Sequence, residues 1–498
     1  MSVAAMEAPG KTAHRLLIGG EYVAGEGAEI TVLNPATEEV VARFAGASSR
    51  QIDATIAAAR RAYDAGDWAL ASREHRAQVV RRFLDELGAR RAALKEIVIS
   101  ETGTPAHAPI MFIQVDSPIV ATRDLIDLYL TLPETEDCGQ PLSERINPFG
   151  SLVLSLRRHV PLGVVTAISA YNFPLYLNLW KVIPALVTGN TVILRPSPLT
   201  PLSALAMAEA AQAAGFPPGV FNIVAEAGAE GGVQLTTDPR VDMVTFTGSN
   251  HVGGQVMKQA ADGLKRIQLE LGGKSAAIYL PDSVERAGMA AHTVCLAHAG
   301  QGCVLGTRVM VPQEHKAEIM AKMKAGLEQV VIGDPLDPTT QMGPVVSAGQ
   351  RERCERYVQL AVDAGAKVVT GGKRPAHLKQ GYFFEPTVLD TPDNGNPAAQ
   401  DEIFGPVVSV IGYTCVDHAI EMANDSTFGL SGYVFGKDLK AAAEVAKRMR
   451  TGTVNVNSGA MSAYVSSGGW GRSGFGRERG AEGLRIYQQT QMLNLANQ

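Results

Sequence analysis

Cys303 is the cysteine whose neighbours best suit a reaction at sulfur. It ends the run Gly300-Gln301-Gly302-Cys303, where small flanking residues let a ligand and the backbone approach the sulfur. A nucleophilic cysteine needs that access and a lowered pKa. The alternative is a buried structural cysteine, because free cysteine is among the most buried residue types. We assign that structural role to the other four cysteines: Cys138, Cys295, Cys354 and Cys415.

Glu270 lies in the run Leu269-Glu270-Leu271-Gly272-Gly273-Lys274. Apolar and polar residues alternate before it, so Gln268 and Glu270 project from one face of an expected strand that ends at two glycines. A carboxylate held there is well placed to act as a general base. The alternative is a solvated glutamate on an amphipathic strand.

Asn172 follows the first expected strand of a parallel sheet, in Tyr171-Asn172-Phe173-Pro174. Its amide can donate a hydrogen bond to a developing oxyanion. An ordinary turn or helix-capping asparagine would have the same local sequence.

Ser249 stands where an expected strand gives way to a helix, in Phe246-Thr247-Gly248-Ser249. Free N–H groups at a helix N-terminus bind phosphate. An N-cap serine without a ligand is the alternative.

The elements around these residues alternate between short apolar strands and helices, which predicts an α/β fold with a doubly wound parallel sheet. Such sheets bind nucleotides at the carboxyl ends of their strands. A helical pattern runs over Ser49–Leu94, with Ser49 as its expected cap. A second α/β alternation follows Gly272 up to about Thr451. The expected strands of the first sheet are Val164–Ile168, Thr191–Leu194, Val220–Val224, Met243–Phe246 and Arg266–Leu271, and its helices are Leu175–Leu186, Ser203–Ala214 and a segment ending near Ala261.

Length and composition narrow the class of protein. With 498 residues, two or three domains are expected. A net charge of −5 argues against a nucleic-acid partner. Five cysteines without a C-x-x-C pair, and histidines without ligand spacing, predict a reducing compartment and no metal site. Neither a signal peptide nor a membrane span is evident, so we expect a cytoplasmic protein without a membrane partner.

Taken in order, the motifs resemble those of the aldehyde dehydrogenase superfamily, and the resemblance runs from about Leu17 to the C-terminus. Each motif alone is weak evidence, and their common order is strong. The motifs are Leu33-Asn34-Pro35-Ala36-Thr37, Asn172-Phe173-Pro174, Phe246-Thr247-Gly248-Ser249, Glu270-Leu271-Gly272-Gly273-Lys274, Gly300-Gln301-Gly302-Cys303, Glu402-Ile403-Phe404-Gly405-Pro406, and Asn424-Asp425 with Gly429-Leu430-Ser431.

The resemblance implies roles for individual residues. Cys303 matches the nucleophile, Glu270 the general base, and Asn172 the side-chain oxyanion donor. Ser249 matches the pyrophosphate contact, and Lys181 a lysine near the active site. The full set of expected cofactor-binding residues is Ile168, Ser169, Asn172, Arg195, Ser197, Gly248, Ser249, Leu271, Glu402 and Phe404.

Two segments depart from the family pattern. The family often has Lys-Pro-x-Glu where this chain has Arg195-Pro196-Ser197-Pro198, so the usual ribose-binding lysine and glutamate are Arg195 and Pro198. A glutamate there would repel the 2′-phosphate of NADP, whereas Arg195 can pair with it. We therefore expect NAD as the main cofactor, with measurable use of NADP. The family's late Pro-Phe-Gly-Gly is Ser466-Ser467-Gly468-Gly469 here, which bears on the substrate-entry loop.

The resemblance also implies three structural parts and a homodimer or homotetramer. The expected parts are a Rossmann-like cofactor domain over 12–136 and 158–272, an α/β catalytic domain over 273–475, and a small β oligomerisation arm over 137–157 and 476–498.

The expected reaction oxidises an aldehyde to its carboxylic acid through a thioester on Cys303, which Glu270-activated water hydrolyses. Transfer of the acyl group to coenzyme A, reduction of an activated acid, and a catalytically silent ligand-binding relative are the alternatives. The expected pocket has no charged residue, which favours a medium or large neutral aldehyde over a semialdehyde with a carboxylate. Its aromatic members leave betaine aldehyde open. The pocket residues are Tyr171, Leu177, Trp180, Val304, Met461 and Tyr464.

Overall fold

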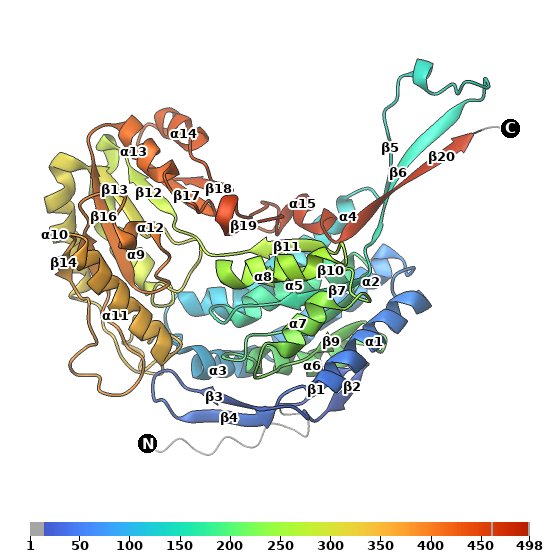
Figure 1. Cartoon of the computed structure of the whole chain (residues 1–498), viewed down its shortest axis with the longest axis horizontal. Coiled ribbons are helices and arrows are strands. Elements are labelled where there is room, and N and C mark those ends of the chain that lie inside the picture. The colour runs from blue at the N-terminus through green and yellow to red at the C-terminus, as the bar shows by residue number, and fades with distance from the viewer. Residues whose placement is uncertain (1–13, 460–461, 497–498) are drawn as a thin grey trace.

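The computed structural model describes residues 14–459 and 462–496. Two large mixed sheets, each flanked by helices, form the body of the molecule (Figure 1). The first is an eight-stranded sheet in the order β19-β11-β10-β7-β8-β9-β1-β2. Its strands are β1 (Leu16–Ile18), β2 (Glu21–Val23), β7 (Val164–Ile168), β8 (Thr191–Arg195), β9 (Phe221–Ile223), β10 (Met243–Thr247), β11 (Arg266–Glu270) and β19 (Gly474–Phe475).

The central five strands of this sheet are parallel and doubly wound, as predicted. The chain leaves β7 in one direction through β8 and β9, then returns to the other side of β7 to form β10 and β11. The topological switch point therefore lies between β7 and β10, where α/β sheets bind nucleotides. The connecting helices are α5 (Pro174–Val187), α6 (Leu202–Ala214), α7 (Glu230–Thr237) and α8 (Asn250–Ala261).

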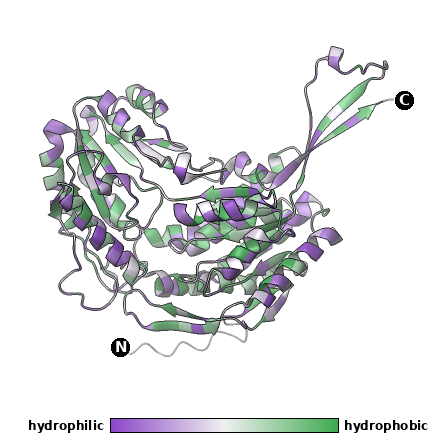
Figure 2. Ribbon diagram, viewed as in Figure 1, coloured by the Kyte–Doolittle hydropathy of each residue, from purple (hydrophilic) through white to green (hydrophobic). Residues whose placement is uncertain are grey.

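Every residue of β7 and of β10 is buried, because helices cover both faces of the sheet. This explains why these strands are continuous apolar runs and do not alternate. Figure 2 shows the apolar strands enclosed by helices of mixed polarity.

The amino-terminal part contributes a hairpin and helices that pack on the first sheet. The prediction that Ser49 caps the first helix is wrong: Ser48 accepts a hydrogen bond from Gln51 N, and Ser49 is already helical. Both serines could serve from sequence, but Gln51 also bonds back to Ser48 N and completes a capping box. The elements are β3 (Glu29–Leu33), β4 (Val40–Ala45), α1 (Ser49–Ala65), α2 (Arg73–Ala89), α3 (Arg91–Thr102) and α4 (Ser117–Thr131).

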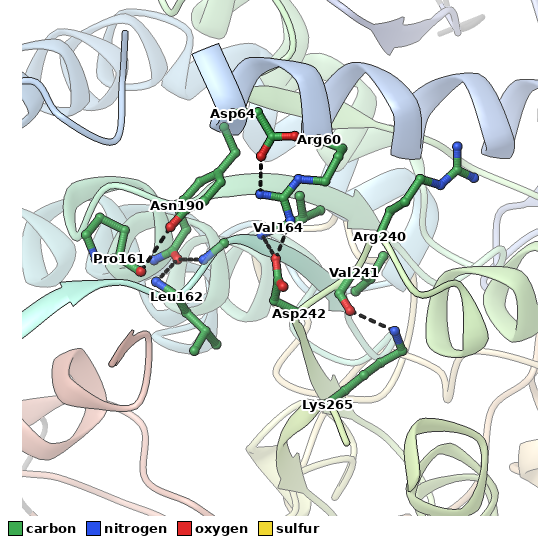
Figure 3. Close-up of polar contacts among 12 residues, drawn as sticks. Arg60, Asp64, Pro161, Leu162, Val164, Asn190, Arg240, Val241, Asp242 and Lys265 are labelled. Carbon is green, nitrogen blue, oxygen red and sulfur yellow. Dashed lines mark hydrogen bonds and ion pairs between the residues drawn. The ribbon is translucent and has the colours of Figure 1, made fainter. Parts of the chain in front are cut away.

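Polar side chains fasten the amino-terminal edge of the first sheet (Figure 3). Asp242, just before β10, accepts hydrogen bonds from Val164 N at 2.7 Å and from Arg60 at 2.9 Å. Asn190 accepts from Leu162 N and Gly163 N at 2.8 and 2.9 Å. Sheets of this type bind ligands at the opposite edge, where the parallel strands end.

The second sheet has seven strands in the order β14-β15-β16-β13-β12-β17-β18. Along β12, Ala277 and Tyr279 enter one apolar cluster and Ala276 and Ile278 another, so both faces are covered. Its strands are β12 (Ala276–Tyr279), β13 (Arg308–Pro312), β14 (Lys367–Thr370), β15 (Thr387–Asp390), β16 (Val407–Tyr413), β17 (Ser431–Phe435) and β18 (Thr453–Val456). Its helices are α9 (Ala290–Leu296), α10 (Lys316–Leu327), α11 (Ala348–Asp363), α12 (Pro397–Gln400), α13 (Val416–Asn424) and α14 (Leu439–Lys447).

A three-stranded antiparallel sheet projects from the body as an arm (Figure 1). It consists of β5 (Thr135–Asp137), β6 (Val153–Pro161) and β20 (Gln488–Ala496), which follows the short helix α15 (Gly480–Arg485). Strand β20 pairs with β6 from Gln488↔Pro161 to Ala496↔Val153. The C-terminal segment therefore lies beside a strand more than 300 residues earlier in the sequence. Across the described ranges, no helix combines the length and apolar character that crossing a membrane requires.

Candidate active site

The predicted reactive residues come from the carboxyl edge of the first sheet and from the loop that enters the second. Asn172 lies between β7 and α5, and Glu270 is the last residue of β11. Thr247, the last residue of β10, pairs with Glu270 in the sheet. Cys303 lies in the segment between α9 and β13.

The chain before Cys303 has an unusual backbone. His298, Ala299 and Gly300 all have positive φ, at 52°, 50° and 71°. Left-handed conformations are costly for residues with a Cβ, so the surrounding packing must hold this turn. A Cβ on Gly300 would lie 2.1 Å from Gly405 O, and one on Gly273 would lie 2.3 Å from Cys303 O. Gly300 and Gly273 are therefore required by close backbone contacts.

Asn172 is buried and is bonded to the segment that precedes Cys303. Its Nδ2 donates to Gln301 O at 2.9 Å, two residues before Cys303. Gln114 donates to Asn172 O at 2.9 Å. An amide Nδ2 carries two hydrogens, so one N–H of Asn172 is left for a ligand.

Glu270 is a desolvated carboxylate with an unusual set of neighbours. Its Oε1 is buried and makes no hydrogen bond to another described residue. Burial first, and then the negative charge of Glu478, raise the pKa of Glu270 well above its usual range. The cations of Lys181 and Arg477 oppose that shift. A carboxylate with a raised pKa is a stronger base than an ordinary glutamate and is suited to accepting a proton.

A polar chain that begins at the charged neighbours of Glu270 runs into the first sheet. Lys181 forms an ion pair with Glu478 at 2.9 Å and donates to Thr245 Oγ1 at 3.1 Å. Thr245 and Tyr487 donate to Gln268 Oε1 at 3.0 and 3.2 Å. Sequence analysis named Lys181 but missed Glu478.

The pKa of the Cys303 thiol is raised to about 12, first by burial and then by the charges of Glu402 and Glu270. The residue as a whole is half-buried. Sequence analysis expected a lowered pKa, which is not what the ligand-free chain has. The thiol is therefore protonated near neutral pH until a base or a positive charge acts on it.

The expected nucleotide-binding residues line the same edge of the sheet. Ser249 Oγ caps α8 by accepting from Val252 N at 3.3 Å, while its side chain stays exposed beside the first helical N–H groups. Gly248 N donates to Glu270 O at 3.1 Å, and Leu271 packs against Gly253. The α8 N-terminus therefore fits a pyrophosphate.

Glu402 covers the two glycines that follow Glu270, and Phe404 lies two residues further along the same segment. Glu402 Oε1 accepts from Gly273 N at 2.8 Å, and a Cβ on Gly272 would lie 2.0 Å from Glu402 Oε2. Burial raises the pKa of Glu402 to about 7. Phe404 has φ of 61°, and Gln350 holds its carbonyl at 2.7 Å. These features form a shaped cradle between the sheet edge and the Glu402 segment, which fits the nicotinamide ribose.

The remaining cofactor residues lie at the ends of β7 and β8. Ile168 and Ser169 are buried, and Ser169 Oγ donates to Asn178 Oδ1 at 2.6 Å. Ser197 Oγ accepts from Leu199 N at 3.3 Å. Arg195 is ion-paired with Glu226 at 2.9 Å, a partner that sequence analysis did not identify.

The expected pocket residues fall into three groups. Tyr171 meets the Phe404 ring edge-on at 5.9 Å, and Leu177 is partly buried. Val304 and Tyr464 are exposed, whereas Trp180 is buried. Met461 lies outside the described residues.

Arg479 is a charged neighbour of this pocket that sequence analysis missed. Its guanidinium lies 4.7 Å from the centre of the Trp180 ring and 5.5 Å from that of Tyr176, and it donates to the Tyr176 hydroxyl. Its Nε is buried without a partner among the described residues. Burial alone lowers the pKa of Arg479 to about 10. No local sequence signal marks Arg479, Glu478 or Glu226, because each acquires its role from residues distant in the chain.

Comparisons with known proteins agree with this geometry. The model of the aldehyde dehydrogenase family matches residues 22–493. A betaine aldehyde dehydrogenase of Bacillus subtilis is 34% identical over 95% of each chain. A mutant of aldehyde dehydrogenase C from Pseudomonas syringae, solved with NAD+ and octanal, superposes with a TM-score of 0.91 at 35% identity, covering 97% of both chains. A betaine aldehyde dehydrogenase of Staphylococcus aureus, solved with NAD+, gives a TM-score of 0.92 at 34% identity, covering 97% of this chain and 95% of the other.

Proposed function

The chain belongs to the aldehyde dehydrogenase family, and we propose from that premise that it oxidises an aldehyde to its carboxylic acid through a thioester on Cys303. The observation that carries the proposal is the Glu270 carboxylate, whose Oε1 is buried and whose pKa is raised well above its usual range at the site that also holds Cys303 and Asn172. A water-activating base is what hydrolysis requires, so free acid is the expected product and acyl transfer to coenzyme A is disfavoured.

In this mechanism the Cys303 thiol gives its proton to solvent water, and the resulting thiolate sulfur adds to the aldehyde carbon. The free N–H of Asn172 Nδ2 and a backbone N–H donate to the resulting oxyanion. Bound NAD would supply the acceptor for the hydride that leaves this carbon, so that the carbon becomes the thioester carbonyl on Cys303. Glu270 then takes a proton from water, which attacks the thioester and releases the acid and the thiolate. Lys181 and Glu478 adjust the proton affinity of Glu270 through their charges.

The N-terminus of α8, capped by Ser249, would hold the pyrophosphate of NAD. Glu402 and Phe404 would hold the nicotinamide ribose and ring. Arg195 and Ser197 would lie beside the adenosine ribose. Ile168 and Leu271 provide apolar surface at the ends of β7 and β11.

We propose a medium or large neutral aldehyde as substrate, held by the aromatic residues of the pocket. Phe173, Tyr176 and Trp180 form a row of edge-to-face rings along α5, with centroids 6.2 and 6.0 Å apart. Betaine aldehyde is disfavoured. Its quaternary ammonium group would need the face of the Trp180 ring, and the Arg479 guanidinium already lies over that ring.

A second candidate is an aldehyde with a carboxylate at its far end. The observation that favours it is Arg479, a desolvated cation whose Nε has no partner among the described residues. Roughly 9 Å of helix axis separates Pro174, at the start of α5, from Trp180. Asn172 lies just before the start of α5. A substrate whose aldehyde group is near Asn172 could therefore place a carboxylate at its far end beside Arg479.

A panel of hexanal, benzaldehyde, succinic semialdehyde and betaine aldehyde distinguishes these substrates by kcat/KM. We expect the neutral aldehydes to be preferred. Preference for succinic semialdehyde, lost in Arg479→Met while hexanal oxidation persists, would establish the second candidate. Preference for betaine aldehyde would contradict both.

We also propose a homodimer or homotetramer assembled through the arm of β5, β6 and β20, whose tip exposes apolar residues. Phe149 is 92% exposed and Leu142 is 71% exposed, which is unfavourable for an isolated chain. The five free cysteines support a reducing compartment such as the cytoplasm.

A further inference from the structure

We propose that the ion pair between Arg195 and Glu226 makes this protein select NAD over NADP. The inference rests on nucleotide binding at the carboxyl edge of the first sheet, not on which aldehyde is oxidised. In this proposal Glu226 is bonded to the Arg195 guanidinium and to backbone N–H groups of α7, which would otherwise be available to the 2′-phosphate of NADP.

The pair lies where two neighbouring parallel strands end. Arg195 is the last residue of β8, and Glu226 comes three residues after the end of β9. The Arg195 Nε and Nη2 atoms both lie 2.9 Å from Glu226 Oε1. Nη2 also donates to Gly228 O at 2.7 Å. The guanidinium is thereby fixed and its charge is balanced.

Glu226 also occupies the N-terminus of α7. Its Oε2 accepts from Gly231 N and its Oε1 from Gly232 N, both at 2.7 Å. A Cβ on Gly231 would lie 2.6 Å from Oε2, so this approach depends on the glycine. Glu226 is only 5% exposed, so an internal carboxylate stands where a helix N-terminus would bind a phosphate.

The consequence differs for the two nucleotides. The 2′-phosphate of NADP carries about two negative charges and needs a cation or free N–H groups. At this edge Arg195 and the first N–H groups of α7 are already bonded to a carboxylate, which also repels a second anion. The 2′-hydroxyl of NAD is neutral and meets no such repulsion. Sequence analysis predicted NAD as the main cofactor with some use of NADP through Arg195, and the pairing with Glu226 occupies the cation on which that use of NADP would depend.

The test is calorimetric titration of the full-length protein with NAD+ and with NADP+, for the wild type and for Glu226→Gln and Glu226→Ala. We expect the wild type to bind NAD+ more tightly. The variants should gain about 10- to 100-fold in NADP+ affinity, since a hydrogen bond to a charged group contributes about 1.5–3 kcal/mol and tenfold corresponds to about 1.4 kcal/mol. Their NAD+ affinity should change by less than about threefold.

Two controls separate this effect from general electrostatics. Glu230→Gln removes a charge from the exposed first residue of α7, which is not paired with Arg195, and should leave NADP+ affinity nearly unchanged. Adding Arg195→Met to Glu226→Gln should abolish the gain, because the freed cation is what binds the phosphate.

Equal affinity of the wild type for both nucleotides would overturn the proposal, as would an equal gain in Glu230→Gln. Stabilisation of each variant against heat by NADP+ gives a second readout if Glu226→Ala is less stable. Because neither measurement uses an aldehyde, failure of the proposed oxidation would be seen separately, as absent turnover in a chain that still binds NAD+.

Discussion

The ionisation of Cys303 offers a direct test of the site. Burial and the charges of Glu402 and Glu270 raise the pKa of this thiol to about 12. The ligand-free protein should therefore hold Cys303 as an unreactive thiol near neutral pH, since only the thiolate is a nucleophile. We predict slow alkylation of Cys303 by iodoacetamide and a steep dependence on pH.

The size of the effect follows from the pKa. At pH 8 about one thiol in 10,000 would be ionised, and the alkylation rate should rise about tenfold per pH unit with no plateau below about pH 10. Glu402→Gln removes the largest charged contribution. If that charge accounts for about one pKa unit, or about 1.4 kcal/mol, the variant should react about tenfold faster at pH 8.

Mass spectrometry of the five cysteine-containing peptides reads each site separately between pH 6.5 and 10. Cys415 is exposed and serves as the accessible reference. Cys295 is fully buried with a pKa also raised to about 12, so it controls for access to the reagent. A plateau in the Cys303 rate at neutral pH would refute the reasoning, because it would mean that the thiolate already exists without a ligand.

Further predictions address catalysis and stability. Cys303→Ala should abolish NAD(P)H formation while NAD+ binding persists, and Cys295→Ala should be mild; near-normal turnover of the first variant would remove the proposed mechanism. Glu270→Gln should give one stopped-flow burst of NAD(P)H and then stall at the thioester, whereas loss of the burst would mean that Glu270 also takes the Cys303 proton. Burial raises the pKa of Glu101 from 4.5 to about 7, so the folded state binds the extra proton and loses stability as pH rises through this interval. Glu101→Gln removes this ionisation but also one of the two oxygens that accept from Leu202 N and Ser203 N, so it should be less stable than the wild type at pH 4 and should gain on the wild type by up to about 3 kcal/mol between pH 4 and pH 8 in urea titrations; the same difference at both pH values would contradict this.

The fold was largely predictable because its signals are local. Strand β7 was predicted with its observed bounds, Val164–Ile168, and the predicted strand Met243–Phe246 stops one residue short of β10. Short apolar runs between helical segments specify a parallel sheet covered on both faces. The cap of α1 was misplaced by one residue, since Ser48 and Ser49 differ only in which one meets Gln51.

The polar partners of the site could not be predicted in the same way. Glu478 reaches Lys181 across 297 positions, and Glu226 reaches Arg195 across 31. Each is an ordinary charged residue in its own segment, and only the packing of the sheet edge gives it a partner. The family motifs include Cys303, Glu270 and Glu402, whereas the charges that act on the pKa of Glu270, those of Glu478, Lys181 and Arg477, lie outside those motifs.

These charges share one consequence for how the site would work. Glu270, Glu402 and Glu478 all act to keep the Cys303 thiol protonated. A site surrounded by carboxylates keeps a reactive sulfur inert while no substrate is present, and it also attracts positive charge. The nicotinamide ring of NAD+ is cationic. Its positive charge near the sulfur would stabilise the thiolate and lower the pKa of Cys303, whereas the carboxylates raise it. On this argument, addition of NAD+ should speed Cys303 alkylation at pH 8 while leaving Cys415 unchanged, and an unaltered Cys303 rate with bound NAD+ would show that Glu270 must activate the thiol alone.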